Sequence, residues 1–156
     1  MMSTEDFDQF HWMLDMVQHI DMGLIVLDRD FHIQMWNGFM VHHSGKHAKD
    51  VQNRSLFEVF PEINEPWFRA KSQPVFDLRC RSFIVWQQRP YLFRCRHVRP
   101  ITGQLPFMYQ NVTMHPMANT RGEVNHMFIS IQDVTNEALA SQTPRATAPS
   151  QQAAQK

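Results

Sequence analysis

The strongest constraint on the fold is a change to a period of two after residue 90. Between 91 and 98 the side chains alternate in character, as in a β-strand with two different faces. Two more strand-like segments, 107–115 and 124–134, are separated by Asn-Thr-Arg-Gly, which favours a reversal of the chain. The sequence therefore predicts a three-stranded antiparallel meander. On its first strand we expect one inward face, made of Tyr91, Phe93, Cys95 and His97.

Another pair of strands is predicted closer to the N-terminus. Residues 23–28 form a short apolar run, and 31–37 alternates after a polar turn. Asn37 is then placed to cap a short helix, and Gly45 is placed to end it. The fold is expected to begin with this hairpin and brief helix.

Helical signals fill the segment between the hairpin and the meander. Ser55 and Glu58 form the Ser-x-x-Glu pattern of a capping box, which predicts one or two turns before Pro61. A longer helix is expected from Pro66 to about Arg81.

A separate amphipathic helix is predicted at the start of the chain, with Ser3 or Thr4 as its N-cap. Its apolar stripe has spacings of three and four residues and consists of Phe7, Phe10, Leu14 and Val17. This stripe fits either packing against its own domain or contact with a second molecule. We expect a homodimer through residues 4–20, because exposed apolar area of this breadth usually marks association.

Composition limits the domain organisation and the partners. A chain of 156 residues and 18.5 kDa, with 43% hydrophobic residues, can build one compact core. Fifteen basic and fifteen acidic residues give a formal net charge of zero, so no overall field favours nucleic acid. We expect the amphipathic helix at 1–20, a folded domain at 21–137 and a disordered tail at 138–156.

Cysteine usage and hydropathy point to the compartment. Cys80 and Cys95 form no CxxC pair, and the first residues do not resemble a secretory segment. No apolar run approaches the roughly 20 residues needed to span a bilayer. These features favour a cytoplasmic protein without membrane insertion.

Several local signals coincide with the landmarks of one family. Asp-Arg-Asp at 28–30 resembles its first hairpin turn, Asn37 the asparagine that ends its second strand, and Asp-Val-Thr at 133–135 its terminal motif. In this order they resemble a PAS domain. The resemblance implies an α+β PAS fold, with a five-stranded antiparallel sheet and short helices on one face.

A closer similarity runs from 86–93 through 99–103 and 107–111 to 133–135. These segments are similar to the PAS domain that precedes proteobacterial diguanylate cyclases. Those proteins continue into a catalytic domain, whereas this chain stops, so cyclase activity does not carry over. No Ser-His-Asp set, carboxylate pair or Gly-rich phosphate loop stands out, and we expect no enzymatic activity.

The resemblance also implies a small cavity between the sheet and its helices. We expect it to be lined by Leu27, Met35, Phe60, Phe76, Phe93, Cys95, Val112, Met114 and Ile129. Asp133 and Thr135 are expected to pass a signal out of the domain. PAS domains use such a cavity for haem, flavin, small metabolites or nothing, so the cofactor stays open.

Particular cofactors can be weighed from the residues present. Flavin photochemistry of the photoreceptor type needs a Cys in the helical layer, and 56–62 contains none. A haem ligand would have to be Cys80, Cys95 or His97. Zinc ligands at His42, His43 and His47 are disfavoured because Gly45 is expected to end the helix that would align them.

Two functions fit these observations. In the first, the chain is a sensory or regulatory module that binds a small molecule or a protein and signals in trans. Its partner would be a signalling enzyme such as a diguanylate cyclase or a histidine kinase, in bacterial cyclic-di-GMP or two-component signalling. In the alternative, the domain is ligand-free and acts as a dimerising or scaffolding adaptor with a fully packed interior.

Overall fold

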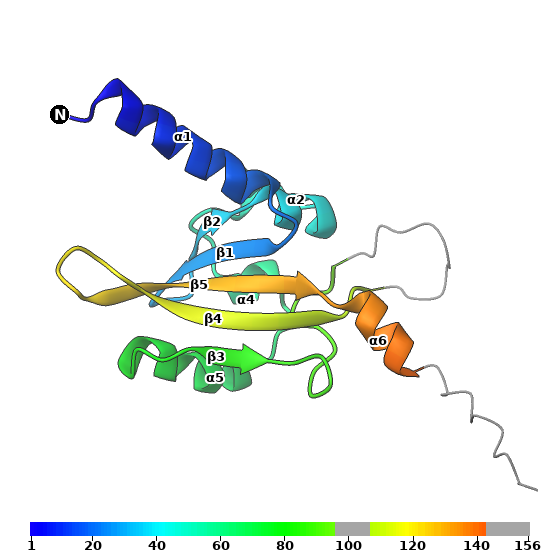
Figure 1. Cartoon of the computed structure of the whole chain (residues 1–156). Coiled ribbons are helices and arrows are strands. Elements are labelled where there is room, and N and C mark those ends of the chain that lie inside the picture. Colours follow the sequence, from blue (N-terminus) through cyan, green and yellow to red (C-terminus); the bar gives the residue numbers. More distant parts are fainter. Residues whose placement is uncertain (96–106, 143–156) are drawn as a thin grey trace, which may run out of the picture.

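A five-stranded antiparallel sheet organises the molecule. The computed structural model describes residues 1–95 and 107–142, and Figure 1 shows the arrangement. The strands are β1 (Gly23–Asp28), β2 (Ile33–Trp36), β3 (Ser82–Ile84), β4 (Gln110–Ala118) and β5 (Val124–Asp133). Their order in the sheet is β2-β1-β5-β4-β3, and every neighbouring pair is antiparallel. The expected α+β architecture is confirmed.

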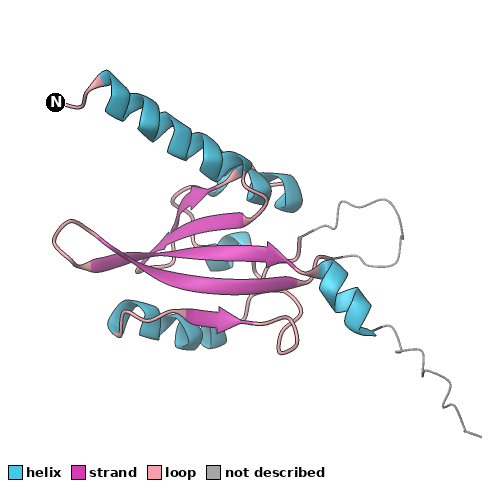
Figure 2. Cartoon of the chain, viewed as in Figure 1, coloured by secondary structure: helices cyan, strands magenta, loops and turns pink. Residues whose placement is uncertain are grey.

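Helices surround the sheet unevenly. They are α1 (Thr4–His19), α2 (Gly38–Ser44), α3 (Ala48–Val51), α4 (Leu56–Val59), α5 (Glu65–Asp77) and α6 (Thr135–Gln142). In Figure 2, α4 and α5 lie behind the sheet, whereas α1 extends away from the β2 edge. Among the described residues, no helix combines the length and apolarity that crossing a membrane requires.

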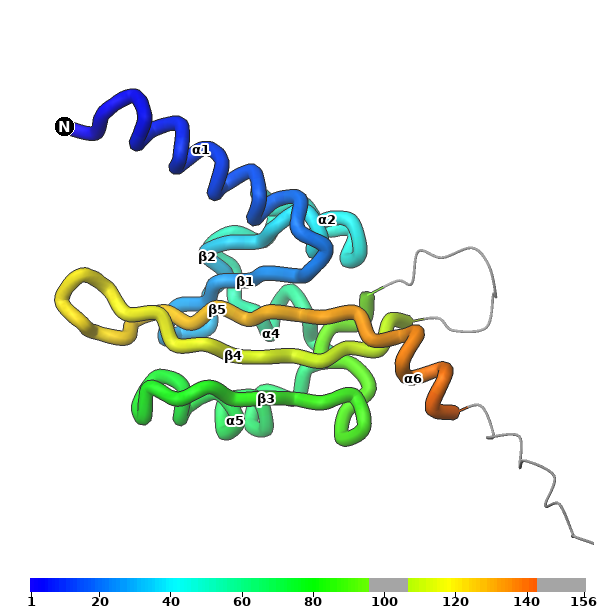
Figure 3. The backbone as a smooth tube through the Cα atoms, viewed as in Figure 1, coloured from blue at the N-terminus to red at the C-terminus, as the bar shows by residue number. Residues whose placement is uncertain are grey.

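The predicted first strand of the meander is wrong. Its place is taken by β3, which pairs Ser82 with Met114 and Ile84 with Val112. The preceding helix ends at Asp77 instead of about Arg81, and the positive φ of 53° at Arg79 turns the chain into the strand. Figure 3 traces this path from α5 through β3.

Residues 91–95 form a loop instead of a strand. The amides of Leu92 and Phe93 bond to the Gln110 side chain, and the Cys95 carbonyl accepts from the Met108 amide. Leu92 and Phe93 are adjacent in sequence, yet both are buried, so strict alternation of faces does not hold. The rest of the predicted strand and the predicted turn at 99–103 lie outside the described residues.

The tail boundary also differs from the prediction. Residues 138–142 belong to α6, and the Ala138 side chain is fully buried. Ala138 donates its amide hydrogen to the Val134 carbonyl, which joins the helix to the end of β5. The remainder of the predicted tail, 143–156, lies outside the described residues.

The predicted N-cap of α1 and the predicted capping box of α4 have different outcomes. At α1 the Ser3 hydroxyl accepts from the Asp6 amide at 3.2 Å, and the Asp6 carboxylate accepts from the Ser3 amide at 3.0 Å. At α4 the helix forms as expected, but Ser55 makes no capping hydrogen bond. The Glu58 carboxylate instead forms an ion pair with Arg54 at 2.8 Å, so the predicted capping box is not formed.

The core lies between the inner face of the sheet and α4 and α5. Phe31, held at a φ of 62°, turns its ring toward Phe68 and Phe76, with ring centroids 5.8 and 6.0 Å away. Phe60 packs against Trp36 at 5.6 Å and Phe93 at 4.9 Å. These aromatic contacts join the loop at 91–95 to the hairpin across the helical layer.

Removing a large core side chain should destabilise the fold. Phe93 and Ile129 are both fully buried, so Phe93→Ala or Ile129→Ala should lower the free energy of unfolding by about 2–5 kcal/mol through cavity formation. Urea denaturation measures the change. Phe83→Ala is the matched control, because 54% of the Phe83 surface is already exposed. Equal losses in Phe83→Ala and Phe93→Ala would contradict the assigned burial.

Candidate functional site

The structure brings most of the predicted pocket residues into one core. All except Met35 are buried: Leu27, Phe60, Phe76, Phe93, Cys95, Val112, Met114 and Ile129. Met35 is half-buried and lines a separate hollow of about 150 Å³ together with Gln18 and Trp36. The buried residues thus contact the interior from the sheet, the helices and the loop at 91–95.

A larger hollow opens beside this core at the loop. Its volume is about 360 Å³, and its lining consists of Glu62, Ile63, Arg89, Pro90, Tyr91 and Leu92. Leu92 is followed directly by the core residue Phe93, so the hollow adjoins the interior. Sequence reasoning placed Tyr91 on the inward face of a strand but missed the other five residues. A strand at 91–98 would put Leu92 on the opposite face, and no sequence signal joins it to residues 62 and 63.

Gln110 holds the loop against the sheet. Its buried side chain accepts hydrogen bonds from the amides of Leu92 and Phe93 at 3.0 and 3.1 Å. It also donates from Nε2 to the Phe93 carbonyl at 2.8 Å. One amide side chain therefore replaces a neighbouring strand as the partner of this backbone, which explains how a loop can supply buried side chains.

Cys95 is a buried thiol within this loop. Burial raises its pKa from an ordinary 9.0 to about 12, and the negative charges of Glu62 and Asp133 add to the increase. A hydrogen bond with Gln110 opposes the shift. The thiol is therefore neutral near pH 7, which makes Cys95 a poor source of the thiolate that a metal requires. Of the other candidate haem ligands, Cys80 is exposed and His97 lies outside the described residues.

Asn37 connects four parts of the backbone. Its Oδ1 accepts from the amides of Leu24 at 3.0 Å and Met40 at 3.3 Å, so it caps α2 as predicted and also holds β1. Its Nδ2 donates to the carbonyls of Val17 at 2.9 Å and Met22 at 2.8 Å. The Asn37 side chain is fully buried, and all of its polar atoms are used.

Gly38 explains how α1 can approach so closely. A Cβ added at Gly38 would lie 2.3 Å from the Gln18 carbonyl oxygen, a distance that no side chain tolerates. Asn37 and Gly38 together therefore fix the C-terminal end of α1 against the hairpin and α2.

The remainder of α1 presents its apolar stripe to solvent. Exposed fractions are 53% for Phe7, 48% for Phe10 and 44% for Leu14, while Val17 is half-buried. No residue of α1 is buried. The stripe therefore does not pack against its own domain within the described part of the chain, and it is available for another molecule.

The predicted output residues Asp133 and Thr135 form one hydrogen-bonded unit. The Asp133 carboxylate accepts from the amide and the hydroxyl of Thr135. The Thr135 hydroxyl oxygen in turn accepts from the Tyr109 amide at 3.1 Å, and the Val134 amide donates to the Tyr109 carbonyl. The beginning of α6 is thus tied to the residue that precedes β4.

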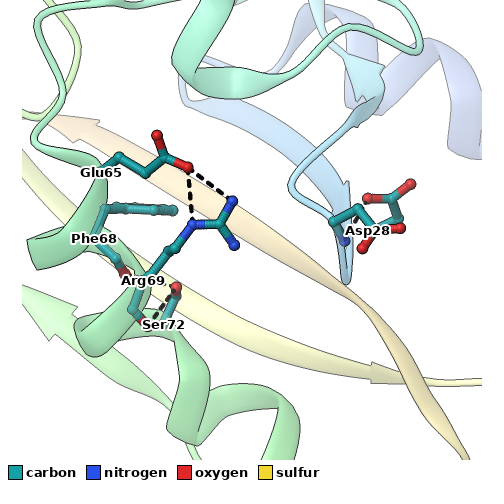
Figure 4. Close-up of polar contacts among 6 residues, drawn as sticks. Asp28, Glu65, Phe68, Arg69 and Ser72 are labelled. Atoms are coloured by element: carbon teal, nitrogen blue, oxygen red, sulfur yellow. Dashed lines mark hydrogen bonds and ion pairs between the residues drawn. The ribbon is translucent and has the colours of Figure 1, made fainter.

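The turn at 28–30 has a structural explanation. Figure 4 shows Asp28 at the end of β1 and, separately on α5, the ion pair of Arg69 with Glu65, whose nitrogen and oxygen atoms lie 2.8 Å apart. Asp28 Oδ1 accepts from the amides of Asp30 and His32, which shapes the turn between β1 and β2. Ligand atoms of these three residues lie within 4.8 Å of one another. Exposed acidic turns often show such proximity without a metal, so this cluster is a turn motif.

The three histidines considered as zinc ligands are divided between two elements. The rings of His42 and His43 lie 5.0 Å apart near the end of α2. Gly45, with a φ of 72°, ends that helix as predicted, and His47 is the N-cap residue of α3. The helical break therefore prevents the alignment of His43 and His47 on one helix face.

Comparison with known families agrees with this architecture. The family described as PAS fold matches residues 17–110. The chain belongs to the PAS family. No curated protein shows a significant match to this PAS domain.

Solved structures of other PAS domains share the fold. A sensory box sensor histidine kinase from Vibrio cholerae is 22% identical over 85% of this chain and 98% of that chain, with a TM-score of 0.56. The PAS domain of Bordetella pertussis BvgS is 16% identical over 86% and 93%, with a TM-score of 0.59. An RNA-binding Light-Oxygen-Voltage receptor is 16% identical over 90% and 38%, with a TM-score of 0.60. At these identities the likeness shows the fold alone.

Removing the Gln110 amide should release the loop. Gln110→Met keeps the length of the side chain but leaves two amides and one carbonyl without their partner, and should cost about 2–4 kcal/mol. Hydrogen exchange should show lost protection at Leu92 and Phe93 before the sheet opens. Gln132→Met, at an exposed position of β5, is the control. Unchanged protection at Leu92 and Phe93 would contradict the role of Gln110.

Stability above pH 9 should depend on Cys95. Because folding raises its pKa, this thiol contributes stability that is complete below pH 9 and is lost as the pH rises toward 12. Between pH 9 and 10 the loss should be about 1 kcal/mol, measured as the free energy of unfolding in urea. Cys95→Ala should lack this part of the decline, whereas Cys80→Ala should retain it. Parallel pH profiles of Cys95→Ala and the unmodified protein would refute the assignment.

Proposed function

We propose that this PAS domain is a non-enzymatic sensory and regulatory module, which binds a small molecule or a partner protein and passes its state to a signalling enzyme. The observation that carries the proposal is the anchoring of α1. Its last turn is bound to the core through Asn37, while its apolar stripe faces solvent. A helix with these two properties can couple the interior of the domain to another molecule.

The coupling has a short physical route. Asn37 directly follows Trp36, whose ring stacks on Phe60, and Phe60 contacts Phe93. A ligand that displaced Phe93 or Phe60 would press on Trp36 and hence on the residue that holds α1. The Asp133 and Thr135 unit offers a second exit toward α6, because it joins the end of β5 to Tyr109.

The receiving partner is proposed from sequence similarity. The segments shared with PAS domains that precede diguanylate cyclases favour a partner in cyclic-di-GMP signalling. A histidine kinase is the other candidate, since PAS folds of histidine kinases are among the similar structures. Either partner would give the protein a role in bacterial signal transduction. The proposed location is the cytoplasm.

The α1 stripe is the proposed homodimer interface. Phe7, Phe10, Leu14 and Val17 recur at spacings of three and four, the spacing with which one helix packs along another. Because these residues are exposed or half-buried in the single chain, burying them between two copies requires no unfolding.

Replacing the middle of the stripe should separate the copies. The double variant Phe10→Gln, Leu14→Gln should change the mass in light scattering from a dimer to a monomer of 18.5 kDa, with an unchanged circular dichroism spectrum. Trp12→Gln, Met16→Gln alters two exposed residues elsewhere on α1 and should remain dimeric. If the Phe10, Leu14 variant stays dimeric, the dimer interface lies elsewhere. If the variant unfolds, the stripe belongs to the core of its own domain.

A ligand-free scaffold is the second candidate, and the packing of the core favours it. The expected pocket residues in the core are only 0–3% exposed. Such low exposure is what a closely packed interior without a ligand cavity would give. Native mass spectrometry and an absorbance spectrum of freshly purified protein distinguish the two functions. A bound small molecule supports sensing through the core, whereas the bare chain mass with no visible absorbance supports the scaffold.

A further inference from the structure

A hollow of about 380 Å³ lies between α5 and the segment after β3, and we call it the α5–β3 hollow. Its lining consists of Trp67, Lys71, Ile84, Gln88, Arg89 and Pro90. Of these residues only Ile84 is buried, so the hollow lies beside the core and is open to solvent. None of them belongs to the expected core pocket. In Figure 1, α5 and β3 lie along the sheet edge opposite β2.

Two positive side chains face this hollow. The Arg89 guanidinium carbon lies 3.8 Å from the centroid of the Trp67 ring, a close cation-π contact. Stacking on the ring orients the planar guanidinium and leaves its N–H groups free to bind an oxyanion along their edge. Lys71 follows Trp67 by one helical turn on α5, which brings a second cation to the same wall.

These two cations differ from the neighbouring arginines, whose charges are neutralised. Arg69 pairs with Glu65 at 2.8 Å, and Arg29 pairs with Asp77 at 3.6 Å. Within residues 1–95 and 107–142, neither Lys71 nor Arg89 has a carboxylate within ion-pair distance. The lining itself contains no acidic residue, and the acidic neighbour Glu62 lines the adjoining hollow at the loop.

The backbone that carries Arg89 is held in place. The Arg89 amide donates to the Val85 carbonyl at 3.0 Å, and the Pro90 carbonyl accepts from the Gln110 amide at 2.9 Å. The Trp86 amide donates to Asn111 Oδ1 at 3.0 Å. These bonds connect the segment to β4, so the guanidinium is positioned before any ligand arrives and less entropy is lost on binding.

We propose that the α5–β3 hollow binds a small organic carboxylate with an apolar body. The carboxylate would make the bidentate contact that a guanidinium favours, with Lys71 supplying a second charge. Ile84 and the Trp67 ring provide apolar surface for the remainder of the ligand. The volume falls within the roughly 300–1,000 Å³ of small-molecule sites. This site goes beyond the proposed function, because it uses none of the expected core-pocket residues and no part of the α1 stripe.

Benzoate is a suitable probe, since it joins one carboxylate to one apolar ring. Its binding to the full chain can be followed by the indole N–H resonance of Trp67, assigned from the spectrum of Trp67→Phe. Benzoate should shift this resonance to saturation. Benzamide has nearly the same shape without the charge and should bind at least about tenfold more weakly, as should inorganic phosphate, which has charge without the ring.

Charge-removing variants test the assigned residues. Arg89→Gln should weaken benzoate binding by about tenfold or more, and Lys71→Gln by a smaller factor. Arg121→Gln makes the same charge change in the turn between β4 and β5 and should leave the affinity unchanged. The amide spectra of the variants show directly whether each is folded.

Several results would overturn the proposal. These are no saturable shift with benzoate, equal affinity for benzamide or phosphate, or equal weakening by Arg89→Gln and Arg121→Gln. None of them would affect the sensory role proposed above, because that role is tested by the contents of the core and by the mass of α1 variants. The two ideas can therefore fail separately.

Discussion

The buried amide of Asn37 is the interaction on which the arrangement of this molecule depends. The Asn37 side chain accepts from the Leu24 amide in β1 and from an amide in the first turn of α2. It donates to the Val17 carbonyl near the end of α1 and to the Met22 carbonyl between α1 and β1. A buried amide group is costly unless each of its hydrogen bonds is made, so these four segments can adopt essentially one mutual geometry. Gly38 allows this geometry by leaving room for the Gln18 carbonyl.

Gln110 performs the equivalent task at the other end of the sheet. The loop at 91–95 belongs to no strand pair, yet it contributes Phe93 and Cys95 to the interior. A buried amide makes that possible because it can both accept and donate along a backbone. The two amides also border the regions proposed to be functional. Asn37 holds the helix that carries the apolar α1 stripe, and the Gln110 backbone holds the segment that carries Arg89.

This division suggests how a PAS domain can keep a closely packed core and still respond to its surroundings. The interior is filled by aromatic rings from the hairpin, the helices and the loop. Two hollows lie where the segment at 84–92 meets the core, and their linings include charged side chains. Under the proposed function no large cavity is needed, because a ligand that displaced Phe93 would act on Phe60, whose ring stacks on Trp36.

Sequence periodicity determined the elements whose hydrogen bonds are local. Sequence patterns predicted the hairpin, the Asn37 cap, the Gly45 stop, the strands that correspond to β4 and β5, and the apolar stripe of α1. Each depends on residues within a few positions of one another, where turn chemistry and alternation act directly. The PAS fold followed from the order of these elements, and most of the expected core residues are indeed buried.

Only the tertiary structure decided the edge of the sheet and the sites beside it. Three residues at 82–84 carry too little periodicity to identify β3, whereas 91–98 alternates convincingly in sequence. Pairing depends on which segment reaches the free edge of β4, and the positive φ at Arg79 brings 82–84 there first. Because β3 occupies that edge, the backbone at 92–93 bonds to the Gln110 side chain instead. The meeting of Arg89 with Trp67, which are distant in sequence, is a consequence of that folding and has no signature in the sequence.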